Sequence, residues 1–253
     1  MRSVNLENAN FKNTTFWNTD LTGANLSGAS LQNCNFGHRC RMDDANLTNA
    51  SLDGSTGTVS MTNCNLTKAD LHNVKMQNMA MSGSNFTQAN MFMANLIRAD
   101  LRQANFSGAC LIEACLTESD FSQSSFKNAD LHRAQLQKTN LAQADFWQAN
   151  LSRARLHGAS MHGANFGESF LIGTEFDHAY VSGGTEVNFQ FADASFADFS
   201  FADLDYARFN GARLSGTVFR GAKLLGTDFW ETDLKYANFE SADLSRAKIP
   251  SAS

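Results

Sequence analysis

The sequence predicts an all-β repeat fold, a solenoid built from short straight segments. Leu, Phe or Met recurs at five-residue steps almost without a break from Leu6 to Val181. An amphipathic helix needs apolar residues at a period near 3.6 and a half-buried strand needs a period of 2, so neither explains this step. The chain also contains a single proline, Pro250, although average usage near 5% would give it about a dozen. The chain therefore turns its many corners without proline.

Each five-residue unit combines one large apolar residue, a small residue two places before it and a polar residue between the two. The stretch ADFWQANLSRARLHGASMHGANF, residues 144–166, shows the pattern, with Phe146, Leu151 and Leu156 as its first three large residues. We call the large residue the centre of its unit. Alternation along an extended chain predicts that the centre and the small residue point inward, and that the polar residue between them points outward.

A longer period of twenty residues predicts how the units are grouped. Phenylalanine centres occur twenty residues apart at Phe86, Phe106, Phe126, Phe146 and Phe166. In a second run, Phe and Leu centres alternate from Phe199 to Leu244. Both patterns fit a square coil of four units, with Phe on two opposite walls and Leu on the other two. Identical rings are then expected to stack from coil to coil at about the inter-strand spacing of 4.8 Å.

The tandem unit A(N/D)LXX resembles the repeat of the pentapeptide repeat family, and the resemblance covers nearly the whole chain. It implies a right-handed quadrilateral β-helix in which each pentapeptide forms one side and four pentapeptides make one coil. In such a solenoid each coil rests only on its neighbours.

The first of two interruptions is compensated. Met42 follows Phe36 one residue late, and Met61 restores the original phase. The segment DGSTGTVS, residues 53–60, omits one residue. We expect it to form an irregular turn or a small loop.

The second interruption, SGGTEVN at residues 182–188, shifts the phase permanently by three residues. It contains the flexible dipeptide Gly183-Gly184. We therefore interpret the chain as a long β-helix over residues 1–181, a linker over 182–188 and a shorter β-helix over 189–253.

The start of the second run can be indexed in two ways, and the choice decides where its aromatic residues point. Three Ala-Asp tripeptides, at 192–194, 197–199 and 202–204, favour the later phase. In that phase four aromatic residues occupy outward corners around one coil: Phe191, Phe196, Phe201 and Tyr206.

Four aromatic side chains left in water would forgo about 1.5–3 kcal/mol each. We therefore expect the 182–188 segment and the last wall of the first helix, including Phe170 and Tyr180, to cover them and to dock the two helices. A collar that binds a partner and the inward indexing are the alternatives.

The sequence contains no arrangement that indicates an enzyme. It shows no nucleophile–base pattern, phosphate-binding loop or zinc spacing, and a core filled by stacked Leu and Phe leaves no substrate cavity. His157, His162 and Asp177-His178 lie close in the repeat, but outward side chains on different walls diverge. We expect no catalytic residue, no metal site and no cofactor.

Composition narrows the remaining classes of protein. The net charge of −5 argues against direct binding of nucleic acid, and no apolar run reaches the length of a membrane span. Five cysteines without CxxC spacing indicate reduced thiols rather than a disulfide framework. We expect a cytoplasmic protein without membrane association.

The preferred functional hypothesis is a rigid scaffold for protein–protein interaction. Outward positions of a solenoid are free to vary while inward positions hold the fold. Apolar residues cluster at such positions on two neighbouring walls, where we predict a patch for a partner or for self-association: Phe92, Met93, Ile97, Ile112 and Ile172. The ends of the repeat show no recognisable cap, which offers a second route to self-association.

The family resemblance implies an alternative function. Its quinolone-resistance members look like a rod of duplex DNA and bind DNA gyrase through acidic faces. The repeat pattern fits such a rod, but no strongly acidic segment stands out in this chain.

Overall fold

Each five-residue unit folds as a short extended bridge followed by a corner. In the computed structural model, which describes residues 2–181 and 186–250, the residue before each centre forms parallel bridges with the neighbouring coils. Asn90 pairs with Cys110, and Cys110 pairs with Asp130. The two residues after the centre form a turn, which closes where the next small residue donates its N–H to the centre, as Ala94 does to the carbonyl of Met91 at 3.0 Å.

The last residue of each turn adopts a positive φ, for example 58° at Gln103 and 61° at Arg153. This left-handed conformation costs a residue with a Cβ atom about 1–2 kcal/mol. Its N–H donates a hydrogen bond to the next coil, as Arg153 does to Ile172 at 3.0 Å. The repeat therefore favours Gly, Asn and Gln at this position, but accepts other residues because the N–H of a corner is bound by the next coil wherever one follows.

The polar residue before each centre also stabilises the corner. The Oδ1 atom of Asn165 accepts the N–H of Gly167 at 3.0 Å. The side-chain amide of Asn165 donates to Asp145 in the preceding coil at 2.8 Å. Asn or Asp therefore recurs because it satisfies a turn N–H and joins neighbouring coils.

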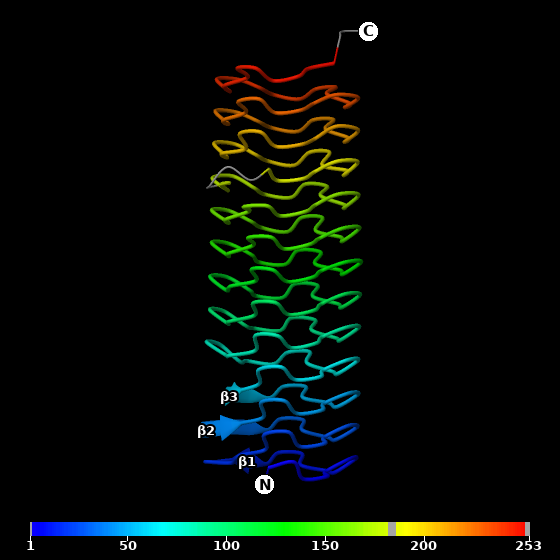
Figure 1. The fold of residues 1–253 in the computed structure, drawn as a ribbon, viewed down its shortest axis with the longest axis vertical. Helices are drawn as coiled ribbons and strands as arrows, with labels where there is room; N and C mark the ends of the chain where they lie inside the picture. Colours follow the sequence, from blue (N-terminus) through cyan, green and yellow to red (C-terminus); the bar gives the residue numbers. More distant parts are fainter. Residues whose placement is uncertain (1, 182–185, 251–253) are drawn as a thin grey trace.

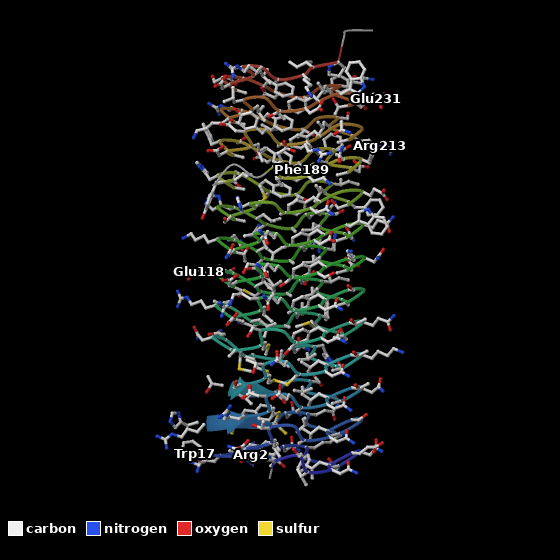
Figure 2. All side chains as sticks on the ribbon, in the orientation of Figure 1. Arg2, Trp17, Glu118, Phe189, Arg213 and Glu231 are labelled. Carbon is white, nitrogen blue, oxygen red and sulfur yellow. The ribbon has the colours of Figure 1, made fainter. Side chains whose placement is uncertain are left out.

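The coils stack into a straight column with the two ends of the chain at opposite ends (Figure 1). Over most of the column, bridge partners stand twenty residues apart, the length of four units. We call each set of units linked by these bridges a wall. Phe189 is fully buried in the column, whereas Figure 2 shows Trp17 and Glu118 projecting from its surface.

The core consists of stacked centres, as the twenty-residue period predicts. The rings from Phe86 to Phe166 stack with centroids 4.6–4.8 Å apart and planes within 6° of parallel. A second column joins Phe176, Phe199, Phe219 and Phe239. The two columns meet edge to face, for example at 5.4 Å between Phe189 and Phe199, so the interior is filled with apolar side chains.

The segment 53–60, expected to be an irregular turn or a small loop, has a turn at residues 53–54 and a strand over residues 56–60. The structure contains three parallel strands in the order β1 (Thr15–Phe16), β2 (Asn35–Arg41) and β3 (Thr56–Ser60). A bulge between Phe36 and Cys40 takes up two residues of β2 that have no partner in β3. Bridge partners are therefore 21 residues apart between the preceding coil and the coil of residues 41–56. They are 19 residues apart between that coil and the next one. The irregularity at this segment is therefore a shift in register between two strands, and a bulge keeps the inter-coil hydrogen bonds that a loop would give up.

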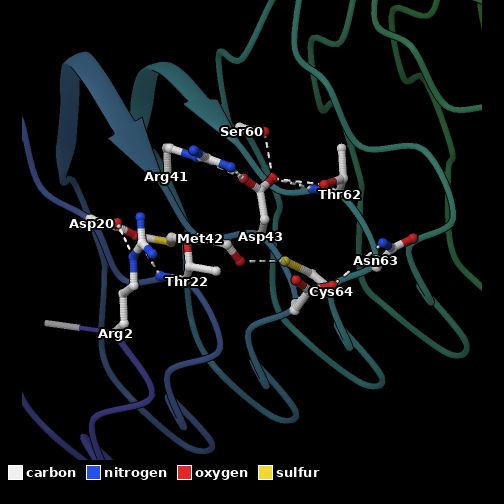
Figure 3. Close-up of polar contacts among 11 residues, drawn as sticks. Arg2, Asp20, Thr22, Arg41, Met42, Asp43, Ser60, Thr62, Asn63 and Cys64 are labelled. Carbon is white, nitrogen blue, oxygen red and sulfur yellow. Dashed lines mark hydrogen bonds and ion pairs between the residues drawn. The ribbon is translucent and has the colours of Figure 1, made fainter.

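A buried carboxylate lies beside this slip in register (Figure 3). Asp43 is 6% exposed and accepts hydrogen bonds from the hydroxyls of Ser60 at 2.5 Å and Thr62 at 2.7 Å. Arg41 lies 3.0 Å from its other oxygen. Burial alone raises the pKa of Asp43, but the hydrogen bonds from Ser60, Thr62 and Arg41 together outweigh it and lower that pKa below its usual value.

The buried cysteines fill small inward positions, as expected from the pattern. The thiol of Cys64 donates to the carbonyl of Met42 at 2.8 Å (Figure 3), and burial raises its pKa to about 12. A thiol held neutral in this way is a packing group rather than a nucleophile.

The three-residue phase shift does not divide the column. Bridges continue across it at a spacing of 23 residues, from Asn165 to Asn188 and from Tyr180 to Asp203. The rings of Phe166 and Phe189 stack at 5.0 Å across it. The two runs therefore form one continuous stack rather than two helices joined by a linker. Gly183-Gly184 lies outside the described residues.

This correction has a simple physical reason. Stacking requires only that the centres of successive coils align, and it does not fix the number of residues at a corner. The sequence reveals the extra residues, but not whether the centres on either side realign.

Stability at low pH tests the Asp43 site. Because the pKa of Asp43 is lower in the folded state, the carboxylate adds to the free energy of unfolding at pH values above its unfolded pKa near 3.8. This stabilisation is lost as the pH falls through the folded-state pKa. We expect Asp43→Asn to lower the free energy of unfolding at pH 7 by about 1–3 kcal/mol, with a smaller difference from wild type at pH 2.5. Denaturant titrations at both pH values measure this. Glu7→Gln, at an exposed position, is the control, and an unchanged difference at pH 2.5 would contradict the assignment.

The stacked core makes a second prediction. Phe126→Ala should destabilise the protein by about 3–5 kcal/mol, because it opens a cavity between two stacked rings. Trp147, the residue after the next centre in the same column, is 37% exposed, and Trp147→Ala should cost only about 1 kcal/mol. Denaturant titration of both variants compares the two positions. Similar costs would show that the inward and outward assignments are wrong.

Candidate interaction surfaces

The described part of the chain offers surface hollows rather than a cleft. The main hollows have volumes of about 240–380 Å³, are open to solvent and are lined mostly by polar side chains. Residues 2–181 and 186–250 contain no group of three or more His, Cys, Asp or Glu side chains placed to hold a metal ion. The same residues contain no helix that could cross a lipid bilayer. Candidate sites must therefore be sought on the outer surface.

The histidines near the middle of the chain form pairs rather than a metal centre. Nδ1 of His157 lies 2.5 Å from a carboxylate oxygen of Asp177. The ring of His178 contacts His157 edge to face at 5.4 Å and stacks on Phe201 at 5.4 Å. These contacts hold the side chains against the column.

The predicted apolar patch divides into two groups. Phe92 and Ile112 occupy equivalent positions on one wall in successive coils, and the N–H of Met93 donates to the carbonyl of Ile112 at 3.0 Å. Phe92 and Met93 are 36% and 46% exposed, whereas Ile97 and Ile112 are half-buried. Ile172 lies three coils beyond Ile112, a distance of about 14 Å at the usual inter-strand spacing, so it belongs to another group.

The four aromatic residues of the predicted collar do face outward. All of them occupy positive-φ corners of one coil, and their exposed fractions lie between 49% and 68%: Phe191, Phe196, Phe201 and Tyr206. Phe170 and Tyr180, which were expected to cover them, are themselves 53% and 44% exposed. Residues 182–185 of the expected cover lie outside the described part of the chain.

Each collar ring packs against a glycine in the following coil instead. A Cβ atom added to Gly211 would lie 2.4 Å from the ring of Phe191, and one added to Gly216 would lie 2.7 Å from the ring of Phe196. The same arrangement repeats at the remaining two corners, where Phe201 faces Gly221 and Tyr206 faces Gly226. One face of each ring therefore covers backbone, and the ring of Phe201 also stacks on His178.

Sequence reasoning had the information to find these pairs. Every collar residue is followed by a glycine twenty residues later, and twenty residues is one coil. A division of side chains into inward and outward does not reveal the pairs, because an outward corner side chain also leans over the next coil.

One wall brings two residues of the collar next to Ile172, the member of the predicted patch that lies apart from the others. Phe170 and Ile172 lie in one coil, and the bridge from Phe170 to Asp193 places the next coil directly beside them. Phe191 and Phe196 occupy the two corners that flank Asp193 in that coil. We call Phe170, Ile172, Phe191 and Phe196 the apolar face; their exposed fractions are 53%, 41%, 61% and 68%.

The polar groups within the apolar face are already engaged. Oδ1 of Asp193 accepts both the N–H of Ser195 at 3.2 Å and its hydroxyl at 2.7 Å. Arg213 lies 3.9 Å from the other oxygen of Asp193. A partner could therefore cover Asp193 without leaving its charge unpaired, which is a requirement for a stable interface.

Comparison with known sequences establishes the family. The model described as "Pentapeptide repeats" matches residues 1–37, 59–88, 84–123, 129–167, 185–221 and 212–249, with eight copies. The chain belongs to the pentapeptide repeat family. No curated protein sequence matches this pentapeptide repeat protein.

Solved structures with a similar fold include HetL from the cyanobacterium Nostoc sp. strain PCC 7120, a pentapeptide repeat protein involved in regulating heterocyst differentiation. It is 22% identical, with a TM-score of 0.46, over 100% of this chain and 92% of HetL. QnrB1, a plasmid-mediated fluoroquinolone resistance protein, is 18% identical with a TM-score of 0.36, over 98% of this chain and 91% of QnrB1.

The aromatic–glycine pairs generate a third prediction. Gly216→Ala should destabilise the protein by about 1–2 kcal/mol more than Gly108→Ala, because the added methyl group displaces the Phe196 ring. Gly108 is the matched control, since it shares the positive φ but a Cβ there would meet only Gln88 at 3.5 Å. Denaturant titrations of a double-mutant cycle measure the effect. The excess cost should vanish when Phe196 is replaced by Ala, and its persistence would contradict the proposed contact.

Proposed function

We propose that this pentapeptide repeat protein is a non-enzymatic rigid scaffold that binds a protein partner through its outer surface. The proposed framework is the right-handed quadrilateral β-helix with four pentapeptides per coil, which the twenty-residue bridge spacing supports. Because the interior positions are filled by apolar side chains, a partner can contact only the outward side chains. A continuous column holds these outward side chains in fixed relative positions. The proposed setting is the cytoplasm.

The apolar face is the observation that supports this function. Exposed apolar residues scattered singly need no explanation, but four large ones gathered on one wall and its corners are typical of an interaction site. The side chains are already ordered by the column, so a partner need not immobilise a flexible loop in order to bind. A second contact region is proposed at Phe92, Met93, Ile97 and Ile112.

The partner can be another protein or a second copy of the chain. Capture from extracts of the native host, using wild type and Phe170→Ser/Phe196→Ser, tests the face. We expect the wild type to retain a partner that the variant loses. Trp17→Ser/Tyr236→Ser is the matched control, because it removes two exposed aromatic residues elsewhere (69% and 79% exposed) and should leave capture unchanged.

Two outcomes would contradict the proposal for this face. The patch variant could capture the same proteins as wild type, or the control variant could lose them equally. Sedimentation velocity on the same three proteins separates self-association from binding of another protein, because only self-association changes the sedimentation of the purified chain with concentration.

A DNA-mimicking ligand of DNA gyrase is the second candidate function, and the straight column favours it (Figure 1). Its charge does not, because acidic and basic residues are interspersed on every wall of the described residues. A supercoiling assay with purified gyrase, with and without a quinolone, discriminates between the two. The scaffold proposal expects no change in either condition, whereas inhibition of supercoiling or protection from the drug would support gyrase binding.

A further inference from the structure

Charged side chains at equivalent positions of successive coils usually pair with the opposite sign. Arg98 lies 2.7 Å from Glu118, twenty residues later, and Lys223 lies 3.0 Å from Asp203, twenty residues earlier. This arrangement follows from the small spacing between coils, which brings equivalent side chains within contact distance.

Arg133 and Arg153 break this pattern. They occupy the same corner column in successive coils, and no other basic residue among residues 2–181 and 186–250 is followed by a second one at the equivalent position. Arg133 pairs at 3.4 Å with Glu113 in the preceding coil. Arg153 makes no side-chain hydrogen bond or ion pair with the described residues, although its guanidinium group carries a full charge.

The coil after Arg153 contributes a hollow instead of a counter-charge. Gly173 occupies the next position in the column, where a Cβ atom would lie 3.9 Å from Cγ of Arg153. The hollow has a volume of about 350 Å³ and is lined by Arg133, Gln135, Arg153, Arg155, Gly173 and Glu175. Arg155 lies 3.4 Å from Glu175, so the lining carries three guanidinium groups against one carboxylate.

These observations together indicate a place where an anion would be bound favourably. Two like charges at the coil spacing repel each other, and an anion between them would turn that repulsion into attraction. A guanidinium group offers a planar fork of N–H donors that matches the oxygens of a phosphoryl group. The amide of Gln135 adds a neutral donor, and the open side of the hollow leaves room for the rest of a larger ligand.

We propose that the hollow formed by Arg133, Arg153, Arg155 and Gly173 binds a phosphate-class oxyanion, either free phosphate or a phosphomonoester. Arg153 supplies the unpaired charge, Arg133 and Arg155 flank it, and Gly173 provides the space. This binding site does not depend on the apolar face, although Phe196 occupies the same corner column one coil beyond Gly173.

Titration of the purified full chain with inorganic phosphate and with O-phosphoserine, followed by isothermal calorimetry at low ionic strength, tests the site. We expect saturable binding in the millimolar range by wild type. Arg153→Gln should weaken it by about tenfold, because the charge without a partner is removed. Tighter binding of O-phosphoserine than of phosphate would identify a phosphomonoester as the natural ligand, and equal affinities would identify free phosphate.

Two further variants separate a specific site from general charge. Arg102→Gln removes one positive charge from an arginine that is already paired with Asp100 at 2.8 Å, and it should bind phosphate as wild type does. Gly173→Asn fills the hollow without changing charge, and Asn73 shows that this corner column accepts asparagine, with a φ of 56°. We expect Gly173→Asn to weaken binding as Arg153→Gln does.

Three results would overturn the proposal. Wild type could show no saturable binding of either probe, Arg102→Gln could lose as much affinity as Arg153→Gln, or Gly173→Asn could bind as tightly as wild type. Thermal unfolding of each variant without phosphate shows whether it is folded before the titrations are compared. Because the probes are small molecules, failure here leaves the scaffold function untouched, and failure to find a protein partner leaves the anion site untouched.

Discussion

The bridge between equivalent residues of successive coils is the interaction on which the rest of this structure depends. It fixes the height of each coil, and it places each centre over the centre of the coil below. Three features follow from that alignment: the stacking of Phe126 between two other rings, the side-chain hydrogen bond from Asn165 to the preceding coil, and the left-handed corners. A corner residue such as Arg153 keeps its costly conformation because its N–H is bound by the next coil.

The same constraint explains how the chain tolerates irregularity. An extra residue in β2 and a missing residue in β3 cancel within two coils, because a bulge preserves the bridges on both sides. The polar cluster around Asp43 supplies hydrogen bonds where the regular pattern shifts. At the second interruption the bridge from Asn165 to Asn188 shows that realigned centres matter more than chain length.

Function in such a column depends on departures from the repeat at outward positions. Outward polar side chains of successive coils usually hydrogen bond or form ion pairs with one another. A surface made only of such regular units would therefore offer a partner few distinctive groups. The apolar face departs by exposing large hydrophobic groups, and the Arg133–Arg153 pair departs by placing like charges together. Both lie near one corner column, which is where we place the candidate sites.

The five-residue and twenty-residue periods by themselves determined the solenoid, its inward and outward positions, and the stacking of Phe86 through Phe166, because these depend on local alternation and on repetition. The indexing that turned Phe191 and Phe196 outward also followed from the tripeptide pattern. The tertiary structure alone decided that the two runs form one column and that the collar rings lean onto the glycines that the twenty-residue period places one coil away. It also decided that Arg153 is left beside a hollow. These features depend on which side chains of neighbouring coils meet and how they lean, and a one-dimensional period does not contain that information.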